Sequence, residues 1–185
     1  NNIRKCFNSN ACSVNNEKYM NNKNTPYIID VEASGFGSNS YPIEIGVALN
    51  NGIKFCTLIT PEKEWKHWDV QAENIHKVSR EQLINYGKTV NDVADMLNEK
   101  LNGMVVYSDG WVVDKPWIIT LFHAANKPMK FSVSPLEMIL SEKQMAVWHE
   151  TKNKIMNQVN LIRHRASNDA WLIQETFKQT LAQTR

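Results

Sequence analysis

Cysteine, excess positive charge and long apolar runs are all scarce in this sequence of 185 residues. Its three cysteines include no CxxC pair and no histidines stand at paired spacing, which argues against a disulfide framework or a zinc site. The formal net charge is only +2, so any nucleic-acid binding must come from local patches. No stretch approaches the roughly 18 to 20 apolar residues of a membrane-spanning helix, and no charged-then-apolar leader opens the printed sequence. We therefore expect a reducing, cytoplasmic setting and no membrane partner.

Composition divides the chain near residue 25. Residues 1–25 hold nine asparagines and few aliphatic side chains, too little apolar surface to offset the entropy of ordering. We interpret them as a polar N-terminal arm or tail. The whole chain is 42% hydrophobic, and residues 26–185 have the length of one domain with one core.

Three short β-rich runs open this domain. Residues 27–33, YIIDVEA, are apolar on both faces except at their acidic end, which predicts a central strand. Apolar runs on both sides of Asn51-Gly52 predict an antiparallel hairpin with a type I′ turn. A further strand is expected in MVVYSDG, residues 104–110, among segments with helical spacing. The sum is a single α/β domain with a mixed β-sheet flanked by helices.

Capping signals locate the helices. Ser79 and Gln82 form a capping-box pattern within the helical stretch 68–87, and Thr89 caps the next helix. Pro116 suits the first turn of a third helix. Residues 134–160 read as one long helical tract, and a final helix is expected from about residue 168 to 182.

Two carboxylates stand together at the end of the first strand. Asp30 and Glu32 are two residues apart, so their side chains project from the same face. Like charges this close resist joint ionisation unless a cation compensates them, and oxygen ligands suit Mg²⁺ or Mn²⁺. A D-x-E pattern is common by chance, however, and a solvated strand end is the simpler explanation of the pair alone.

Further candidates lie downstream. Asp114 follows an apolar pair at a helix start, where capping is the ordinary role of an aspartate. His164 precedes Asp169 by five residues, on a loop that leads into the last helix. Taken singly, such a histidine is usually a surface residue and such an aspartate a favourable charge at a helix N-terminus. Their combination is much less ordinary.

The order D-x-E, then an aspartate at a helix start, then H-x4-D resembles the DEDDh subgroup of DnaQ-like 3′-5′ exonucleases. HRASNDA, residues 164–170, is similar to that family's third motif and DVEASGFG, residues 30–37, to its first; YPIEIGVAL and AENIHKVSREQL resemble the segments between. The similarity spans about residues 27–178. The sequence departs from the family pattern in two places. In SDGWVVD, both Asp109 and Asp114 are candidates for the aspartate of the second motif, and Lys77 stands where a glycine is usual. We prefer Asp114 for its helix-start context.

The resemblance implies an RNase H-like fold and stepwise hydrolysis of phosphodiester bonds from a 3′ end. It implies a general base, His164, and two Mg²⁺ or Mn²⁺ ions. The metal-binding residues that it implies are Asp30, Glu32, Asp114 and Asp169. Two such ions neutralise charge on the attacked phosphate and the leaving oxygen, which explains why four carboxylates would converge.

Two substrate contacts also follow from the resemblance. Phe36 would lie against the terminal bases, and His76 would approach the terminal nucleotide. From the residues alone, Phe36 is as readily a core side chain and His76 as readily a surface histidine.

The expected partners are 3′ ends of single-stranded nucleic acid. DNA and RNA remain equal alternatives, because the 2′-hydroxyl is sensed by details of pocket shape, and a homodimer stays open. A catalytically silent nucleic-acid-binding or interaction module of the same fold is the main alternative function, and a hydrolase of another phosphoester is a third. The complete set of five site residues favours the enzyme, since a silent relative need not keep mutually repelling charges.

Overall fold

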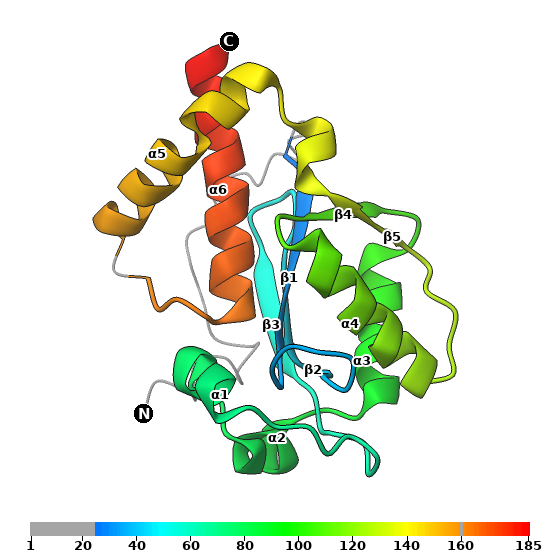
Figure 1. The fold of residues 1–185 in the computed structure, drawn as a ribbon. Helices are drawn as coiled ribbons and strands as arrows, with labels where there is room; N and C mark the ends of the chain where they lie inside the picture. Colours follow the sequence, from blue (N-terminus) through cyan, green and yellow to red (C-terminus); the bar gives the residue numbers. More distant parts are fainter. Residues whose placement is uncertain (1–24, 160) are drawn as a thin grey trace.

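The sheet and its covering helices are seen in a computed structural model, which describes residues 25–159 and 161–185 (Figure 1). The expected arm, residues 1–25, lies outside the described residues except for Thr25. The strands are β1 (Tyr27–Ala33), β2 (Pro42–Ala48), β3 (Lys54–Leu58), β4 (Val105–Ser108) and β5 (Ser132–Pro135). The helices are α1 (Val70–His76), α2 (Arg80–Tyr86), α3 (Val90–Leu101), α4 (Trp111–Ala124), the 3-10 turn η2 (Leu136–Ile139), α5 (Glu142–Gln158) and α6 (Ala166–Thr184).

The sheet is mixed, and its strand order is β3-β2-β1-β4-β5. β1 pairs antiparallel with β2 and parallel with β4, which confirms the expectation that the acidic strand is central. The β1–β2 register shifts between Glu32 and Ala33. Such irregularities bend a strand and re-aim its side chains, and here one follows directly on the second acidic residue.

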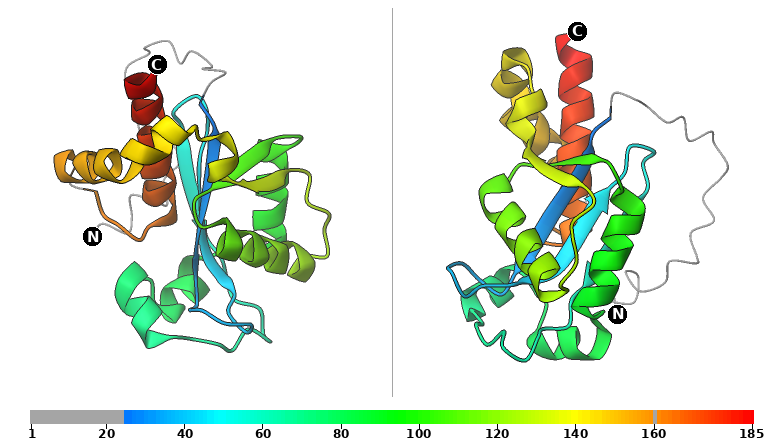
Figure 2. Two further views of the ribbon diagram at one scale, coloured as in Figure 1. Left: turned by 45° about the horizontal axis from the view of Figure 1, so that its top comes forward. Right: turned by 90° about the vertical axis from the view of Figure 1, so that its right-hand side faces the viewer.

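Helices cover both faces of this sheet (Figures 1 and 2). One core joins Ile29 and Val31 of β1 to α3 and α4, and a second joins Ile28 of β1 to α5 and α6. Side chains alternate along a strand, so β1 contributes to both cores and the Ile28 face also carries its acidic residues. Helix α2 packs around Tyr41 and Leu83, and α1 lies next to it beyond the C-terminal end of β1. No helix in the described ranges is long and apolar enough to cross a membrane.

The hairpin between β2 and β3 is confirmed, but its predicted type I′ turn is wrong. The Leu49 N–H donates to the Ile53 carbonyl at 2.8 Å and the Gly52 N–H to the Leu49 carbonyl at 3.1 Å, which closes a three-residue loop. Gly52 has a φ of 82°, whereas Asn51 is not among the residues with positive φ. A type I′ turn has a two-residue loop and needs positive φ at both residues. With a third residue in the loop, only Gly52 adopts a positive φ, which glycine does without strain.

Local capping signals placed the starts of α2 and α3 correctly, but not those of α4 and α5. Ser79 and Gln82 form the capping box of α2, and the Thr89 side chain caps α3. The third helix begins earlier than expected, at Trp111, so Pro116 lies beyond its first turn. The long tract 134–160 is helical only from Glu142, because its first residues extend β5 alongside β4 and then form η2. That pairing is a tertiary effect, which the helical spacing of the tract does not reveal.

Candidate metal centre and active site

Three elements bring four acidic side chains together at the centre of the sheet. Asp30 and Glu32 project from β1. Asp114 lies in the first turn of α4, which follows the neighbouring strand β4, and Asp169 lies in the first turn of α6. Each group acts electrostatically on others in the set, so the constellation expected from the sequence is assembled in space.

Burial and mutual repulsion raise the pKa of three of these carboxyl groups, those of Asp30, Glu32 and Asp114. The pKa of Asp30 lies well above its ordinary value, first because of burial and then because of Asp114 and Glu32. Burial, followed by the charge of Asp169, raises the pKa of Glu32 to about 8. Burial also raises the pKa of Asp114 to about 7, although a hydrogen bond from Ser108 opposes the shift. Groups that resist joint ionisation in this way fit a site for hard divalent cations.

Asp114, rather than Asp109, faces the interior of this cluster. The residue is 4% exposed, and its carboxylate accepts a hydrogen bond from the Ser108 hydroxyl. Gly110 is the N-cap of α4 and no side chain caps that helix, so the alternative that Asp114 is a cap is wrong. Asp109 instead forms an ion pair with Lys152 of α5, with 2.9 Å between Oδ2 and Nζ, and is more exposed.

The loop before α6 holds Asp169 from two sides. The His164 backbone N–H donates to Asp169 Oδ2 at 2.8 Å, and Arg163 Nε donates to Oδ1 at 2.6 Å. His164 has a φ of 59°, in the left-handed region, and its side chain is exposed. Ligand atoms of Glu32, His164 and Asp169 lie within 4.8 Å of one another, which is close enough to share one metal ion.

A buried ion pair fastens this loop to β2. Glu44 is fully buried, and its carboxylate accepts hydrogen bonds from the Arg165 guanidinium at 2.7 to 3.3 Å and from the Ala166 backbone N–H at 3.1 Å. Gly46, on the same face of β2, lets the loop approach closely: a Cβ there would lie 2.1 Å from the backbone of Ala166 and Ser167. The pair Glu44–Arg165 therefore fixes the backbone between His164 and Asp169.

We call the pair Glu44–Arg165 the clamp. Neither of its residues is among the site residues expected from the sequence. A signal for it exists, because Glu44 is the one charged residue in the apolar strand PIEIGVA. It lies opposite Glu32 in the β1–β2 register, on the face that carries the site. The sequence alone offers no partner for it, since Arg165 lies 121 residues away.

The exposure of Phe36 and of His76 contradicts the ordinary alternative for each residue. The Phe36 side chain is 74% exposed, with its ring centroid 6.0 Å from that of Trp117, so the core alternative is wrong. His76 is 3% exposed, so it is not a surface histidine. Its Nδ1 accepts the Val78 N–H at 3.1 Å, whereas its Nε2 has no hydrogen-bond partner within the described residues. Burial lowers the pKa of His76, which keeps the ring neutral and Nε2 available to a ligand.

No protein-family model matches this chain, and no curated protein sequence matches it. Solved structures do. The zinc-bound complex of E. coli exonuclease I with single-stranded DNA superposes with a TM-score of 0.63 at 10% identity, over 86% of this chain and 41% of that one. A product-bound exonuclease I gives 0.63 at 9% identity, over 86% and 43%.

A moderately thermophilic exonuclease I from Methylocaldum szegediense gives a TM-score of 0.58 at 11% identity, over 85% of this chain and 43% of that one. This chain thus spans less than half the length of these proteins. At such low identity the likeness establishes the fold. The chain has an RNase H-like fold.

Proposed function

We propose that this chain is a metal-dependent 3′-5′ exonuclease that hydrolyses single-stranded DNA or RNA one nucleotide at a time. The observation that carries the proposal is the convergence of Asp30, Glu32, Asp114 and Asp169 from three elements, with the pKa of three of them raised. Burying such a cluster is costly without a compensating cation. The fold shared with exonuclease I, which has been solved with single-stranded DNA, supports a nucleic-acid substrate.

The four carboxylates would hold two divalent ions, Mg²⁺ or Mn²⁺, and Asp109 would stay at the rim with Lys152. Such ions, when bound, neutralise the phosphate, acidify a water molecule and stabilise the leaving oxygen. His164 takes the proton of the attacking water. Its side chain is exposed beside Glu32 and Asp169, whereas its backbone is held by Asp169, so the ring can reach the water while the loop stays in place.

Phe36 and His76 would contact the terminal nucleotide. Phe36 presents an exposed ring only four residues after Glu32, and stacking of a base on such a ring is worth roughly 1 to 3 kcal/mol. His76 is buried and its Nε2 has no hydrogen-bond partner within the described residues, so it would engage the nucleotide through Nε2.

The experiment is digestion of 5′-labelled single-stranded DNA and RNA oligonucleotides in Mg²⁺ or Mn²⁺, with a chelator control. We expect a ladder that shortens from the 3′ end, and no ladder with chelator. Asp30→Asn, purified in the same way, controls for contaminating nucleases. A 3′ phosphate should block attack. Cleavage of a circular single strand as fast as a linear one would replace the exonuclease by an endonuclease.

One contact favours the silent module as second candidate. Arg163 already neutralises Asp169 without a metal, as a residue in a non-catalytic relative could. That candidate predicts binding of single-stranded oligonucleotides with no hydrolysis in either metal, whereas the enzyme predicts turnover that Asp30→Asn abolishes.

A further inference from the structure

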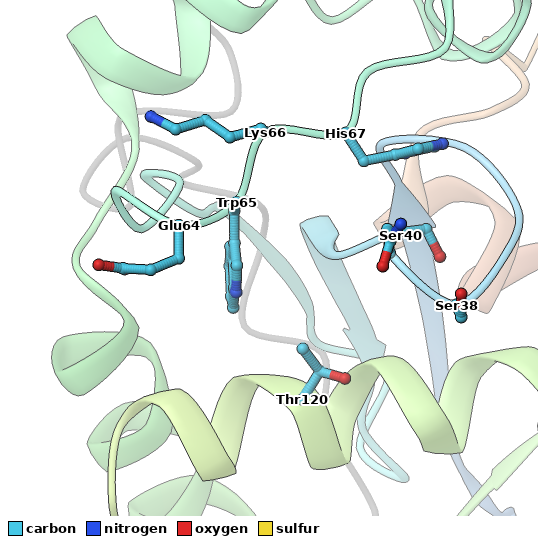
Figure 3. A pocket seen from close by; sticks show the side chains of 8 residues that line it. Ser38, Ser40, Glu64, Trp65, Lys66, His67 and Thr120 are labelled. Carbon is cyan, nitrogen blue, oxygen red and sulfur yellow. The ribbon is translucent and has the colours of Figure 1, made fainter.

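A polar hollow of about 560 Å³ opens beyond the C-terminal end of β1 (Figure 3). Three segments line it: the β1–β2 loop, the loop before α1, and α4. The residues that line it are Ser38, Asn39, Ser40, Glu64, Trp65, Lys66, His67 and Thr120. None of them is a residue that the proposed chemistry uses.

The hollow is joined to the acidic strand by short, rigid contacts. Ser34, two residues after Glu32, shares a hydrogen bond of 3.1 Å between its hydroxyl and Nδ1 of His67. The Asp69 N–H donates to the Ser34 carbonyl at 2.8 Å. Gly35 packs so tightly here that a Cβ would lie 2.6 Å from that of Asp69. The loop that leaves β1 therefore begins two residues after Glu32 and forms one wall of the hollow.

Phe36 and Trp117 continue this wall. The exposed Phe36 ring lies against Trp117, and Trp117 Nε1 donates to the Ser40 hydroxyl at 2.8 Å. Ser40 itself borders the hollow. If the terminal base of a single-stranded nucleic acid contacts Phe36, its neighbouring nucleotides would therefore reach the hollow.

Trp65 is held in place before any ligand arrives. Tyr41 stacks on one face of the indole, with ring centroids 5.0 Å apart and planes 19° apart. Arg80 fixes both residues, donating from Nη2 to the Trp65 carbonyl at 2.7 Å and from Nη1 to the Tyr41 hydroxyl at 3.2 Å. Trp65 is partly packed on the core and also lines the hollow. A pre-set aromatic surface loses little entropy when a base packs on it.

The polar groups of the hollow suit a base and its sugar better than a bare phosphate. Within residues 25–159 and 161–185, the Ser38 hydroxyl and the Asn39 amide make no hydrogen bond, and both are exposed. Lys66 and Glu64 balance each other in charge. An aromatic ring holds a nucleobase without strict sequence preference because every base has a π-face, and the uncommitted polar groups beside it are free to contact the base edge or the sugar.

We propose that this hollow is a second nucleotide subsite, which binds a base on the 5′ side of the cleaved nucleotide in single-stranded nucleic acid. The inference rests on the proposed function, because the 3′ polarity decides which part of the strand lies there. It predicts that affinity rises once a strand is long enough to reach Trp65.

The test compares binding of single strands of increasing length, from two to about ten nucleotides, with Ca²⁺ in place of the active metals. Wild-type protein should show a step in affinity at one length. Trp65→Ala should lose about five- to hundredfold in affinity for strands beyond the step, the loss expected for one stacked base. Trp65→Phe should restore most of it, because the ring remains. Lys63→Ala, on the same loop but outside the hollow, is the matched control.

Three outcomes would overturn the subsite. The first is an affinity that rises smoothly with oligonucleotide length, and the second is a step in affinity that Trp65→Ala leaves intact. The third is an equal loss of affinity in Trp65→Ala for short and long oligonucleotides, which would indicate a general structural effect. If Trp65→Ala unfolds, Asn39→Ala on an exposed loop provides a second test of the subsite. An unchanged affinity step in Asn39→Ala would count against the subsite. Hydrolysis of the same strands in Mn²⁺ is measured in parallel. Turnover without a Trp65-dependent step refutes the subsite alone, whereas a step without turnover refutes the exonuclease.

Discussion

Glu44 of β2 and Arg165 of the loop before α6 form a buried ion pair across 121 residues of sequence, with 2.7 Å between Oε1 and Nη2. The pair holds the short segment that contains His164, the proposed base, and Asp169, a proposed metal ligand. Since Glu44 also accepts the Ala166 N–H, it holds the backbone of that loop as well as one side chain.

Replacing Glu44 by Gln should reduce both stability and turnover. Breaking a buried pair by removing one partner leaves an uncompensated charge and typically costs about 3 to 5 kcal/mol. The loss of alignment should lower kcat more than it raises KM, because His164, the proposed base, is displaced whereas Phe36, the proposed substrate contact, is not. Denaturant unfolding and steady-state kinetics measure the two effects. Glu175→Gln, which breaks the more exposed pair with Lys178, is the control and should cost below about 1 kcal/mol. Equal stability losses in the two variants would contradict the clamp.

Asp30→Asn should raise the melting temperature of the metal-free protein while it abolishes hydrolysis. The pKa of Asp30 is raised by burial and by the charges of Asp114 and Glu32, so folding forces its carboxyl group either to take up a proton or to bear repulsion, and Asn avoids that cost. Melting curves in chelator measure the effect. Glu99→Gln, an exposed isosteric change on α3, is the control and should leave the curve where it was. A lower melting temperature for Asp30→Asn would show that its carboxylate stabilises the fold even without metal.

The metal-free protein should lose stability as pH rises from about 5 to about 8. The folded protein keeps Glu32 and Asp114 protonated up to pKa values of about 8 and about 7, whereas in the unfolded chain they ionise near 4.5 and 3.8. The folded state therefore binds more protons in this window, and its stability is lost as pH passes through the folded pKa values. The lowered pKa of His76 acts in the opposite sense, around and below its ordinary 6.5.

Melting temperatures in chelator across this pH range test that expectation. Adding Mg²⁺ should flatten the dependence, because the cation favours the ionised carboxylates. Glu32→Gln should remove part of the decline and leave the contribution of His76. A melting temperature in chelator that stays level or rises up to pH 8 would contradict the shifted pKa values.

His164→Ala should lower kcat by roughly 10²- to 10⁴-fold with little change in metal affinity, because it removes a base and none of the carboxylates. Calorimetric titration with Mn²⁺ measures the affinity separately from turnover. His149→Ala, an exposed histidine on α5, is the control. The ring atoms of His164 lie within 4.8 Å of ligand atoms of Glu32 and Asp169, so loss of metal binding in this variant would make it a ligand.

The sequence by itself determined what depends on near neighbours along the chain. The side chains of Asp30 and Glu32 share a face because strand side chains alternate, and the Thr89 and Ser79 caps need only residues within one turn. The hairpin was also readable at Gly52, although the added residue that changed its turn type was not.

Only the tertiary structure decided features that depend on distant partners. β5 exists because β4 offers it a parallel edge, although its last two residues, Ser134 and Pro135, belong to a tract whose spacing predicts a helix. His76 is buried because other segments cover it, while Phe36 stays exposed although its residue type favours a core. Glu44 is an isolated acid in the printed sequence; it becomes a clamp only where folding delivers Arg165, because a charge is tolerated inside a protein only with its partner.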